Sequence, residues 1–197
     1  MNRVLRLIIR RLTQERGYTL IELLTVLLIL GVVMGGLTGV FASATSAQAD
    51  MNNRFQAQQE ARLGLDKLRR EAHCASAATP ASSNTSSITF TLPSYCKTYS
   101  GNASVTWCTR SVSTGRYALY RVNGATCTGG VKWADFLIPT STAAVCSGAL
   151  CVFNYTPQTT SSLGKLHIDF PINVKPSRTV DTYELTDDLV LRNTTRS

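Results

Sequence analysis

Residues 18–41 form an apolar stretch, YTLIELLTVLLILGVVMGGLTGVF, in which Glu22 carries the only charge. A helix rises about 1.5 Å per residue, so this stretch is long enough to cross a hydrocarbon core of about 30 Å. Residues 1–17 hold five arginines, whereas residues 42–53 hold no basic side chain. Because basic residues favour the cytoplasmic side of a membrane, this asymmetry predicts a cytoplasmic amino terminus and an exported remainder.

The net charge of the chain has two separate origins. The 197 residues include 20 Lys and Arg against 12 Asp and Glu, a net charge of +8 that suggests a nucleic-acid partner. Residues 1–17 supply five arginines and one glutamate, so the rest of the chain has 15 basic and 11 acidic side chains, a net charge of +4. Half of the net positive charge therefore lies in the segment that sets the orientation in the membrane. DNA binding becomes an alternative hypothesis rather than the first one. Hydrophobic residues make up 44% of the chain, which excludes wholesale disorder.

Two ordinary explanations of the apolar stretch remain open. A secretory signal has a shorter apolar core followed by a small-residue cleavage site, a role that Ser43-Ala44 or residues 47–49 fill loosely. A plain membrane anchor explains the length but not Glu22. A carboxylate within a membrane helix costs a few kcal/mol and usually has a functional partner.

The residues around this carboxylate, Gly17-Tyr18-Thr19-Leu20-Ile21-Glu22-Leu23-Leu24, and the apolar stretch after them resemble the type IV pilin family, which includes the pseudopilins of type II secretion. The resemblance implies that a prepilin peptidase cuts between Gly17 and Tyr18 and that the new amine of Tyr18 is N-methylated. It also implies that Glu22 neutralises the amine of a neighbouring subunit during assembly. Opposite charges are tolerated in an apolar filament core only as a pair. The family usually has Phe at the first mature position, and we expect the aromatic ring of Tyr18 to preserve processing.

The sequence beyond the apolar stretch favours a continued helix. Residues 43–74 contain no proline and many good helix formers, and residues 54–75 resemble the J-type minor pseudopilins and minor pilins. We expect one helical face to pack on a β-sheet; it is formed by Met51, Phe55, Ala61, Leu65, Leu68 and Ala72. The basic cluster at residues 67–70 has two interpretations. One is a site for nucleic acid or anionic lipid, and the other is a solvated face paired in part with Asp66 and Glu71.

We expect an α+β fold, with the long amino-terminal helix packed on a carboxyl-terminal antiparallel β-sheet. The predicted segments are a cleaved leader (1–17), an apolar transmembrane or filament-core helix (18–42), an amphipathic helix (43–74), a Ser/Thr-rich loop (75–87) and an exported β-rich domain (88–197). Short runs rich in β-branched and aromatic residues predict the strands. They are Ile88–Leu92, Ser104–Arg110, Arg116–Val122, Val131–Ile138, Leu150–Tyr155, Lys165–Phe170 and Asp188–Arg192. Alternation in the second run suggests one buried face, formed by Val105, Trp107 and Thr109.

The cysteine pattern favours disulfides over metal binding. The six cysteines are Cys74, Cys96, Cys108, Cys127, Cys146 and Cys151, and no C-x-x-C pair occurs. An even number in an exported domain predicts three bridges, with fifteen possible connectivities. A tight loop between Cys146 and Cys151, and a link from Cys74 to the sheet, are hypotheses within that set.

Few residues suggest chemistry, so we expect no enzyme activity and no cofactor. The chain has no G-x-S-x-G, Walker A or G-x-G-x-x-G motif. His73 beside Cys74 could ligate a metal, and His167 could share a strand face with Asp169. An acidic group could hold Ca²⁺, but its spacing fits no EF-hand and favours a solvated turn; it consists of Asp181, Glu184, Asp187 and Asp188.

These observations predict a prepilin-like minor subunit of a bacterial type IV pilus or type II secretion pseudopilus. Its expected partners are the prepilin peptidase/methyltransferase, other pilin or pseudopilin subunits and the inner membrane. We expect a single membrane pass with an exported domain, followed by a place in a periplasmic or cell-surface filament or its tip. The alternatives are a competence-type minor pilin that contacts DNA and a membrane-anchored exported protein of another function.

Overall fold

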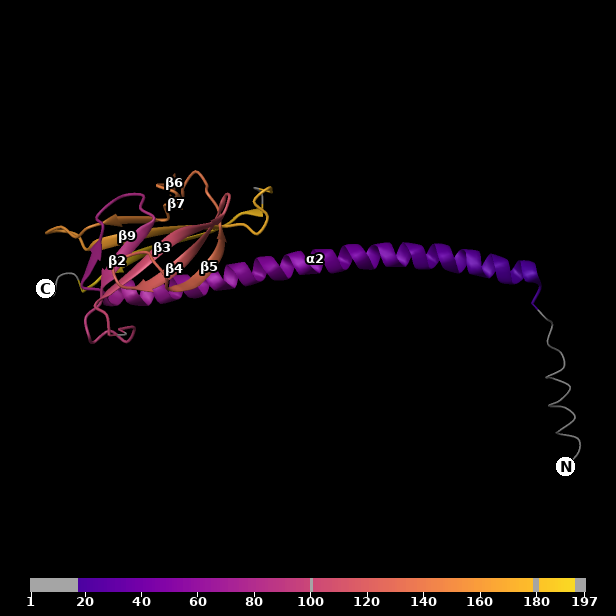
Figure 1. Ribbon diagram of the computed structural model, residues 1–197, viewed down its shortest axis with the longest axis horizontal. Coiled ribbons are helices and arrows are strands. Elements are labelled where there is room, and N and C mark those ends of the chain that lie inside the picture. Colours follow the sequence, from indigo (N-terminus) through magenta and orange to yellow (C-terminus); the bar gives the residue numbers. More distant parts are fainter. Residues whose placement is uncertain (1–17, 100, 179–180, 194–197) are drawn as a thin grey trace, which may run out of the picture. The chain divides into compact units, whose positions relative to one another are not determined.

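The computed structural model describes residues 18–99, 101–178 and 181–193 (Figure 1). The predicted leader, including Gly17, lies outside the described residues. The chain consists of two compact parts, one up to Asp50 and one from Met51 onward.

Helix α2 extends from Leu20 to Cys74 and belongs to both parts. Its carboxyl end is held within the second part by two contacts from the end of the chain. The side-chain amide of Asn193 donates hydrogen bonds to the carbonyl oxygens of His73 and Cys74, at 3.1 and 3.3 Å. These carbonyls lack helical partners at a helix end, so Asn193 acts as a cap from outside the helix.

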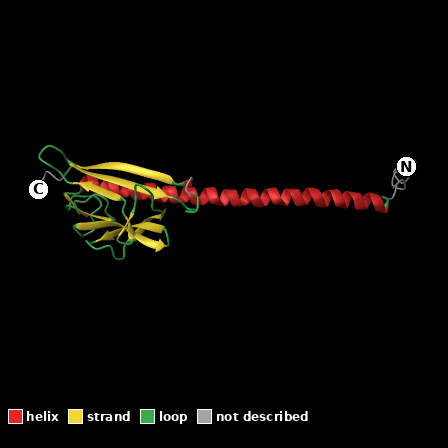
Figure 2. Ribbon diagram, turned by 90° about the horizontal axis from the view of Figure 1, so that it is seen from above, coloured by secondary structure: helices red, strands yellow, loops and turns green. Residues whose placement is uncertain are grey.

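Antiparallel strands follow the helix, and the predicted α+β fold is confirmed (Figure 2). The sheet order is β1-β2-β3-β4-β5-β9-β10, with β8 also paired to β9, while β6 and β7 form a separate hairpin. The strands are β1 Ala77–Thr79, β2 Ser87–Thr91, β3 Ser104–Ser113, β4 Arg116–Asn123, β5 Val131–Leu137, β6 Val145–Cys146, β7 Ala149–Leu150, β8 Phe153–Thr156, β9 Gly164–Ile172 and β10 Tyr183–Leu191.

Small residues let the second part of α2 approach the sheet closely. The buried residues of the helix are Ala57, Ala61, Gly64, Leu65, Leu68, Glu71 and Ala72. A Cβ atom added at Gly64 would lie 3.4 Å from the Cβ atom of Trp133, at the short limit of ordinary van der Waals contact. The expectation that Met51 and Phe55 share this packed face is wrong, because their side chains are 72% and 60% exposed. Burial begins only at Ala57, beyond both of them.

A buried ion pair joins α2 to the sheet. The Glu71 carboxylate is fully buried and accepts a 2.6 Å hydrogen bond from Trp107 Nε1 of β3 and a 2.8 Å bond from Arg121 Nε of β4. Lys67 Nζ lies 3.7 Å away, one helical turn before it. A charge removed from water needs such partners, so Glu71 has both a cation and an indole donor.

The expectation that strand β3 has a single buried face is wrong. Residues 105–109 of β3 are all buried, including Thr106 and Cys108, which lie between the apolar positions. The hydroxyl of Thr106 donates to the carbonyl of Gly124, at 2.7 Å, and contacts the hydroxyl of Thr89, at 2.8 Å. Polar side chains can therefore be buried on the second face, because each has a local partner.

Three further expectations about strands are corrected. The predicted loop over 75–87 contains β1, which pairs with β2. The single strand expected over Leu150–Tyr155 is split, because Cys151 and Val152 separate β7 from β8. Strand β10 begins five residues before the predicted start at Asp188, so Glu184, Asp187 and Asp188 lie in a strand rather than in a solvated turn.

The six cysteines form three disulfide bonds. Cys74–Cys96 ties the end of α2 to the segment after β2, Cys108–Cys127 links β3 to the segment after β4, and Cys146–Cys151 closes the short loop around the β6–β7 hairpin. All six cysteines are therefore paired, as the even number predicted.

Candidate functional site: the amino-terminal part of helix α2

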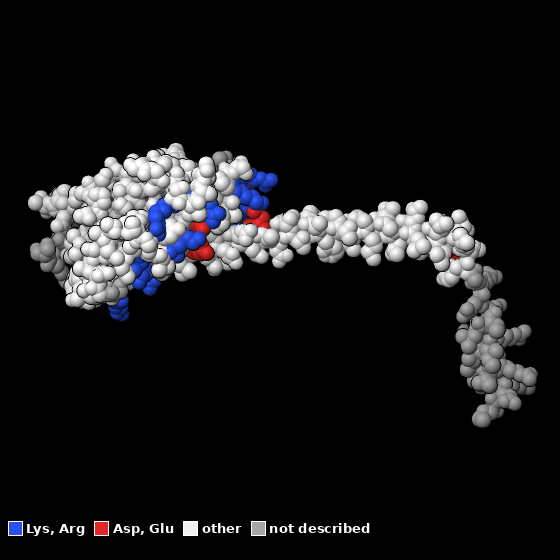
Figure 3. Space-filling model, viewed as in Figure 1, with Lys and Arg blue, Asp and Glu red and all other residues white. Residues whose placement is uncertain are grey.

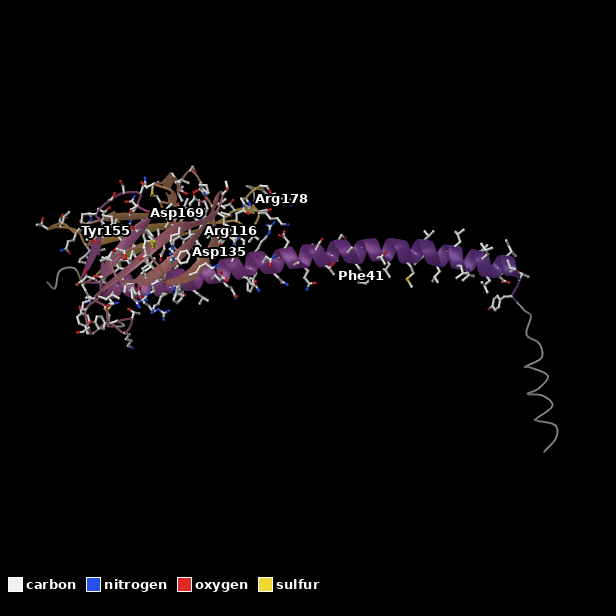
Figure 4. The ribbon with its side chains drawn as sticks, viewed as in Figure 1. Phe41, Arg116, Asp135, Tyr155, Asp169 and Arg178 are labelled. Atoms are coloured by element: carbon white, nitrogen blue, oxygen red, sulfur yellow. A yellow bond between two sulfur atoms is a disulfide. The ribbon has the colours of Figure 1, made fainter. Side chains whose placement is uncertain are left out.

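An uninterrupted apolar surface covers the amino-terminal part of α2. Every residue over 18–49 is exposed. The exposed residues include large apolar ones distributed along the stretch from Tyr18 to Phe41. Figure 3 shows this stretch without blue atoms, and Figure 4 labels Phe41 near its end. Of the described residues, α2 is the one helix long and apolar enough to cross a membrane. Soluble proteins rarely expose so large an apolar surface, so it is suited to lipid or to other apolar helices.

The polar side chains of this stretch satisfy their hydrogen bonds within the helix. The hydroxyl of Thr25 donates to the carbonyl of Glu22, and that of Thr38 donates to the carbonyl of Gly35, both at 2.9 Å. Ser43 donates to Val40 in the same way. Such bonds lower the cost of placing a hydroxyl in an apolar medium, so these residues do not oppose the apolar character of the surface.

Glu22 is held in the first turn of α2. Thr19 precedes the helix, and its hydroxyl oxygen accepts a 3.3 Å hydrogen bond from the backbone N–H of Glu22. The pattern Thr-x-x-Glu is typical of a capping box, and a carboxylate at a helix amino terminus interacts favourably with the helix dipole. Within the described part of the chain, no ion pair involves the Glu22 side chain. This carboxylate is therefore positioned by the helix and available to a cation from elsewhere.

Four glycines lie on the same stretch, at positions 31, 35, 36 and 39. A Cβ atom added at any of them would meet no described atom within 4 Å. Packing within the described chain does not require these glycines, and each weakens the helix by up to roughly 1 kcal/mol. Small residues at such spacing permit close approach of another helix.

Of the other predicted residues, His167 and Asp169 both lie on β9 and line one pocket, whereas His73 is not among the lining residues of that pocket. His73 Nδ1 lies 3.0 Å from the carbonyl oxygen of Val190, whereas His167 Nδ1 contacts Asp188 Oδ1 at 2.8 Å. Over the described ranges, no group of three His, Cys, Asp or Glu side chains could hold a metal ion. The absence of a cofactor stays a prediction.

Basic side chains pair with three of the four carboxylates of the acidic group. Asp181 pairs with Arg54 and Asp187 with Arg69, and Asp188 pairs with Lys165. The same ion pairs occupy part of the basic cluster over 67–70, in which Arg69 also pairs with Asp66. The cluster is therefore a partly neutralised helix face, which weakens its interpretation as a DNA or lipid site.

The comparisons with known proteins concern the same amino-terminal stretch. The family model of the prokaryotic N-terminal methylation motif matches residues 12–38. The matched range contains Gly17, Tyr18 and Glu22 and most of the apolar surface of α2. No curated protein and no solved structure shows a significant match to the chain.

Sequence reasoning missed two features, the helix cap formed by Thr19 and the burial of Asp169, although Asp169 itself was singled out beside His167. The cap formed by Thr19 could have been found from the Thr-x-x-Glu pattern before the apolar run. The buried carboxylate of Asp169 has no such local signal, because its burial comes from segments distant in sequence.

Proposed function

Because this pilin-like chain carries the prepilin-type amino terminus of the type IV pilin and pseudopilin family, we propose that it is a minor structural subunit of a bacterial filament system rather than an enzyme. The main support for the proposal is that the matched motif and the exposed apolar surface lie on the same stretch of the chain. The matched motif over 12–38 overlaps the exposed apolar surface of α2, and Glu22 is the one carboxylate of that surface over residues 18–49.

Maturation begins with the leader. The prepilin peptidase cuts between Gly17 and Tyr18, which removes the arginine-rich residues 1–17 and creates a new amine on Tyr18. The same enzyme N-methylates this amine. The exposed position of Tyr18, one residue before the helix cap at Thr19, supports this step because a peptidase needs access to extended backbone.

Assembly then places the apolar surface of α2 against other subunits. The new amine of one subunit is paired with the Glu22 carboxylate of its neighbour, so that neither charge is buried alone. The glycines over 31–39 permit close helix contacts. Before assembly, the same surface holds the protein in the inner membrane, with its amino terminus in the cytoplasm and residues 51–197 exported.

The exported domain provides selective contacts in the filament or at its tip. Its three disulfides support this placement, because such bonds persist in oxidising compartments. The type of machine, whether pilus, secretion pseudopilus or competence system, follows from the partners of this domain.

Cleavage is tested by substitution of Gly17. The variant Gly17→Val adds a branched side chain at the cleaved bond, and we expect the uncut precursor to accumulate in the membrane fraction. Intact mass measurement of the chain from cells that contain the peptidase distinguishes a terminus at Met1 from a methylated one at Tyr18.

A matched control is Gly31→Val, which makes the same substitution within α2 and outside the cleaved bond. This control is expected to give the mature mass. Normal maturation of Gly17→Val, or a cut of the native chain after residues 43–49, would overturn the assignment.

A further inference from the structure

A polar pocket lies on the sheet domain beside strands β8 and β9. We call it the Asp169 pocket, and its lining residues are Asn84, Thr142, Cys151, Val152, Phe153, Asn154, His167 and Asp169. Backbone pairing brings these segments together: Thr85 bonds to Phe153, and the N–H of Asp169 donates to the carbonyl of Val152 at 3.0 Å.

One of the lining residues of this pocket has a carboxylate without a partner in the described chain. Asp169, labelled in Figure 4, is only 6% exposed, and its Oδ1 atom is buried with no hydrogen-bond partner in the described chain. A buried charge without a partner costs several kcal/mol. In native structures such a group normally has a ligand, water or ion as its missing partner.

The two basic side chains on the same strand do not pair with this carboxylate. Lys165 and His167 share the strand β9 with Asp169, but both contact Asp188, at 3.0 and 2.8 Å. Asp188 lies opposite His167 in the register of β10. Asp188 thus contacts both basic side chains, and Asp169 remains the one carboxylate among the pocket's lining residues, without a partner in the described chain.

The other polar groups of the pocket supply further acceptors. Asn154 lies opposite His167 on β8, and Asn84 enters the pocket from a left-handed backbone conformation, with φ of 57°. Each side-chain amide has an oxygen that can accept hydrogen bonds. The carboxylate of Asp169 and these amide oxygens, all on lining residues of one pocket, can accept hydrogen bonds from a cation that donates in several directions.

We propose that the Asp169 pocket binds the cationic end of an arginine or lysine side chain from a partner protein. An anionic ligand would face the unpaired carboxylate, and a neutral ligand would leave its charge uncompensated. A metal ion would have Asp169 as its one available carboxylate, since Asp188 is already paired. A guanidinium or ammonium group both neutralises Asp169 and donates hydrogen bonds to it. This inference is independent of the amino-terminal site.

The test uses the full chain in detergent micelles and two matched probes. N-acetyl-arginine methylamide carries the guanidinium, and N-acetyl-citrulline methylamide is a neutral compound of nearly the same shape. Binding is followed by the NMR signals of the Asn84 and Asn154 side-chain amides and of the Asp169 backbone. We expect saturable shifts with the arginine probe and at least about tenfold weaker binding of the citrulline probe.

Two variants complete the test. Asp169→Asn is expected to weaken binding of the arginine probe at least about tenfold and to leave the melting temperature equal or higher, because an unpaired charge is removed. Asp66→Asn, which makes the same charge change on α2 outside the pocket, is expected to bind normally.

Several results would overturn the proposal. They are equal binding of the two probes, unchanged binding by Asp169→Asn, or no saturable shift. A clear loss of stability in Asp169→Asn would instead reveal a partner within the chain. Calcium chloride that shifts the same signals and displaces the arginine probe would identify a metal site instead.

Discussion

Four carboxylates in this chain show how neighbouring groups decide the role of a residue. Glu71 and Asp135 are buried with basic partners and fix the sheet domain. Glu22 is exposed in the first turn of an apolar helix, and Asp169 is buried without a partner. The first two are explained within the chain. The other two need a cation from outside it, which is why both belong to proposals about binding.

The paired state of Asp135 predicts acid sensitivity. Burial alone would raise the pKa of Asp135, but hydrogen bonds from Arg116, Lys132 and the backbone N–H of Phe136 outweigh it and lower the pKa to about 2. Arg116 and Asp135 lie side by side in Figure 4. Because the pKa in the folded state lies below the unfolded value of 3.8, Asp135 stabilises the fold above that pH. This contribution, about 2 kcal/mol, is lost as the pH falls from about 4 through about 2.

Urea unfolding of the native chain and of Asp135→Asn at pH 7, 4 and 2 measures this effect. The native chain is expected to be more stable at pH 7, and the gap should shrink steadily toward pH 2. A gap in unfolding free energy that stays the same over this range would contradict the role given to the Asp135 carboxylate.

At Glu71 the prediction is a large loss of stability. In Glu71→Ala, the indole N–H of Trp107 and the Nε–H of Arg121 both lose their acceptor, although Arg121 keeps its hydrogen bond to Asn123. Removing one member of a buried ion pair costs about 3–5 kcal/mol. The free energy of unfolding, from urea denaturation followed by tryptophan fluorescence, checks this value.

Glu60→Ala is the matched control for this change. Glu60 is an exposed glutamate on the same helix, and its substitution should alter stability by less than about 0.5 kcal/mol. If the two variants are equally stable, the contacts of Glu71 with Trp107 and Arg121 do not hold α2 to the sheet.

At the scale of elements, local pattern predicted most of the fold. The absence of proline predicted a helix that runs through to Cys74, and β-branched and aromatic runs located the cores of β2, β3, β4, β5 and β9. Strand β1 was missed because Ala-Ala-Thr has no strand signal, and it is formed by pairing with β2. The start of β10 was missed because acidic residues suggest solvent, whereas Asp187 and Asp188 are paired with basic side chains from α2 and β9.

Contacts between segments distant in the chain were harder to predict from the sequence than the elements themselves. Strand β5 lies beside β9 through the pairing of Leu137 with Ile172, although other strands intervene in the chain. The even number of cysteines predicts three bonds but leaves their connectivity open. The motif predicts roles for Gly17 and Glu22, because their spacing is local. Alternation on one strand placed Asp169 beside His167, but the burial of Asp169 could not be predicted in this way, because distant segments create it.

For the whole molecule, the two parts of the chain make two separate kinds of contact. The part up to Asp50 has an apolar surface with one carboxylate, whereas the part from Met51 onward has a complete core of its own. Substitutions in the core should therefore change the stability of the sheet domain, and substitutions on the amino-terminal surface should change membrane or filament contacts. Glu22 allows this separation to be tested at a single position.

Glu22 has two candidate roles, as the acid of the helix cap and as the charge partner of a neighbouring amine. Glutamine can replace glutamate in a capping box but cannot pair with a cation as an ion. We expect Glu22→Gln to be cleaved and methylated normally and to keep its helix content. Its incorporation into sheared filaments should fall at least about tenfold, because one charge is left unpaired in an apolar surrounding. Thr19→Ala is the matched control, since it weakens the cap and retains the charge. Normal incorporation of Glu22→Gln together with loss in Thr19→Ala would assign Glu22 to helix capping and contradict charge pairing.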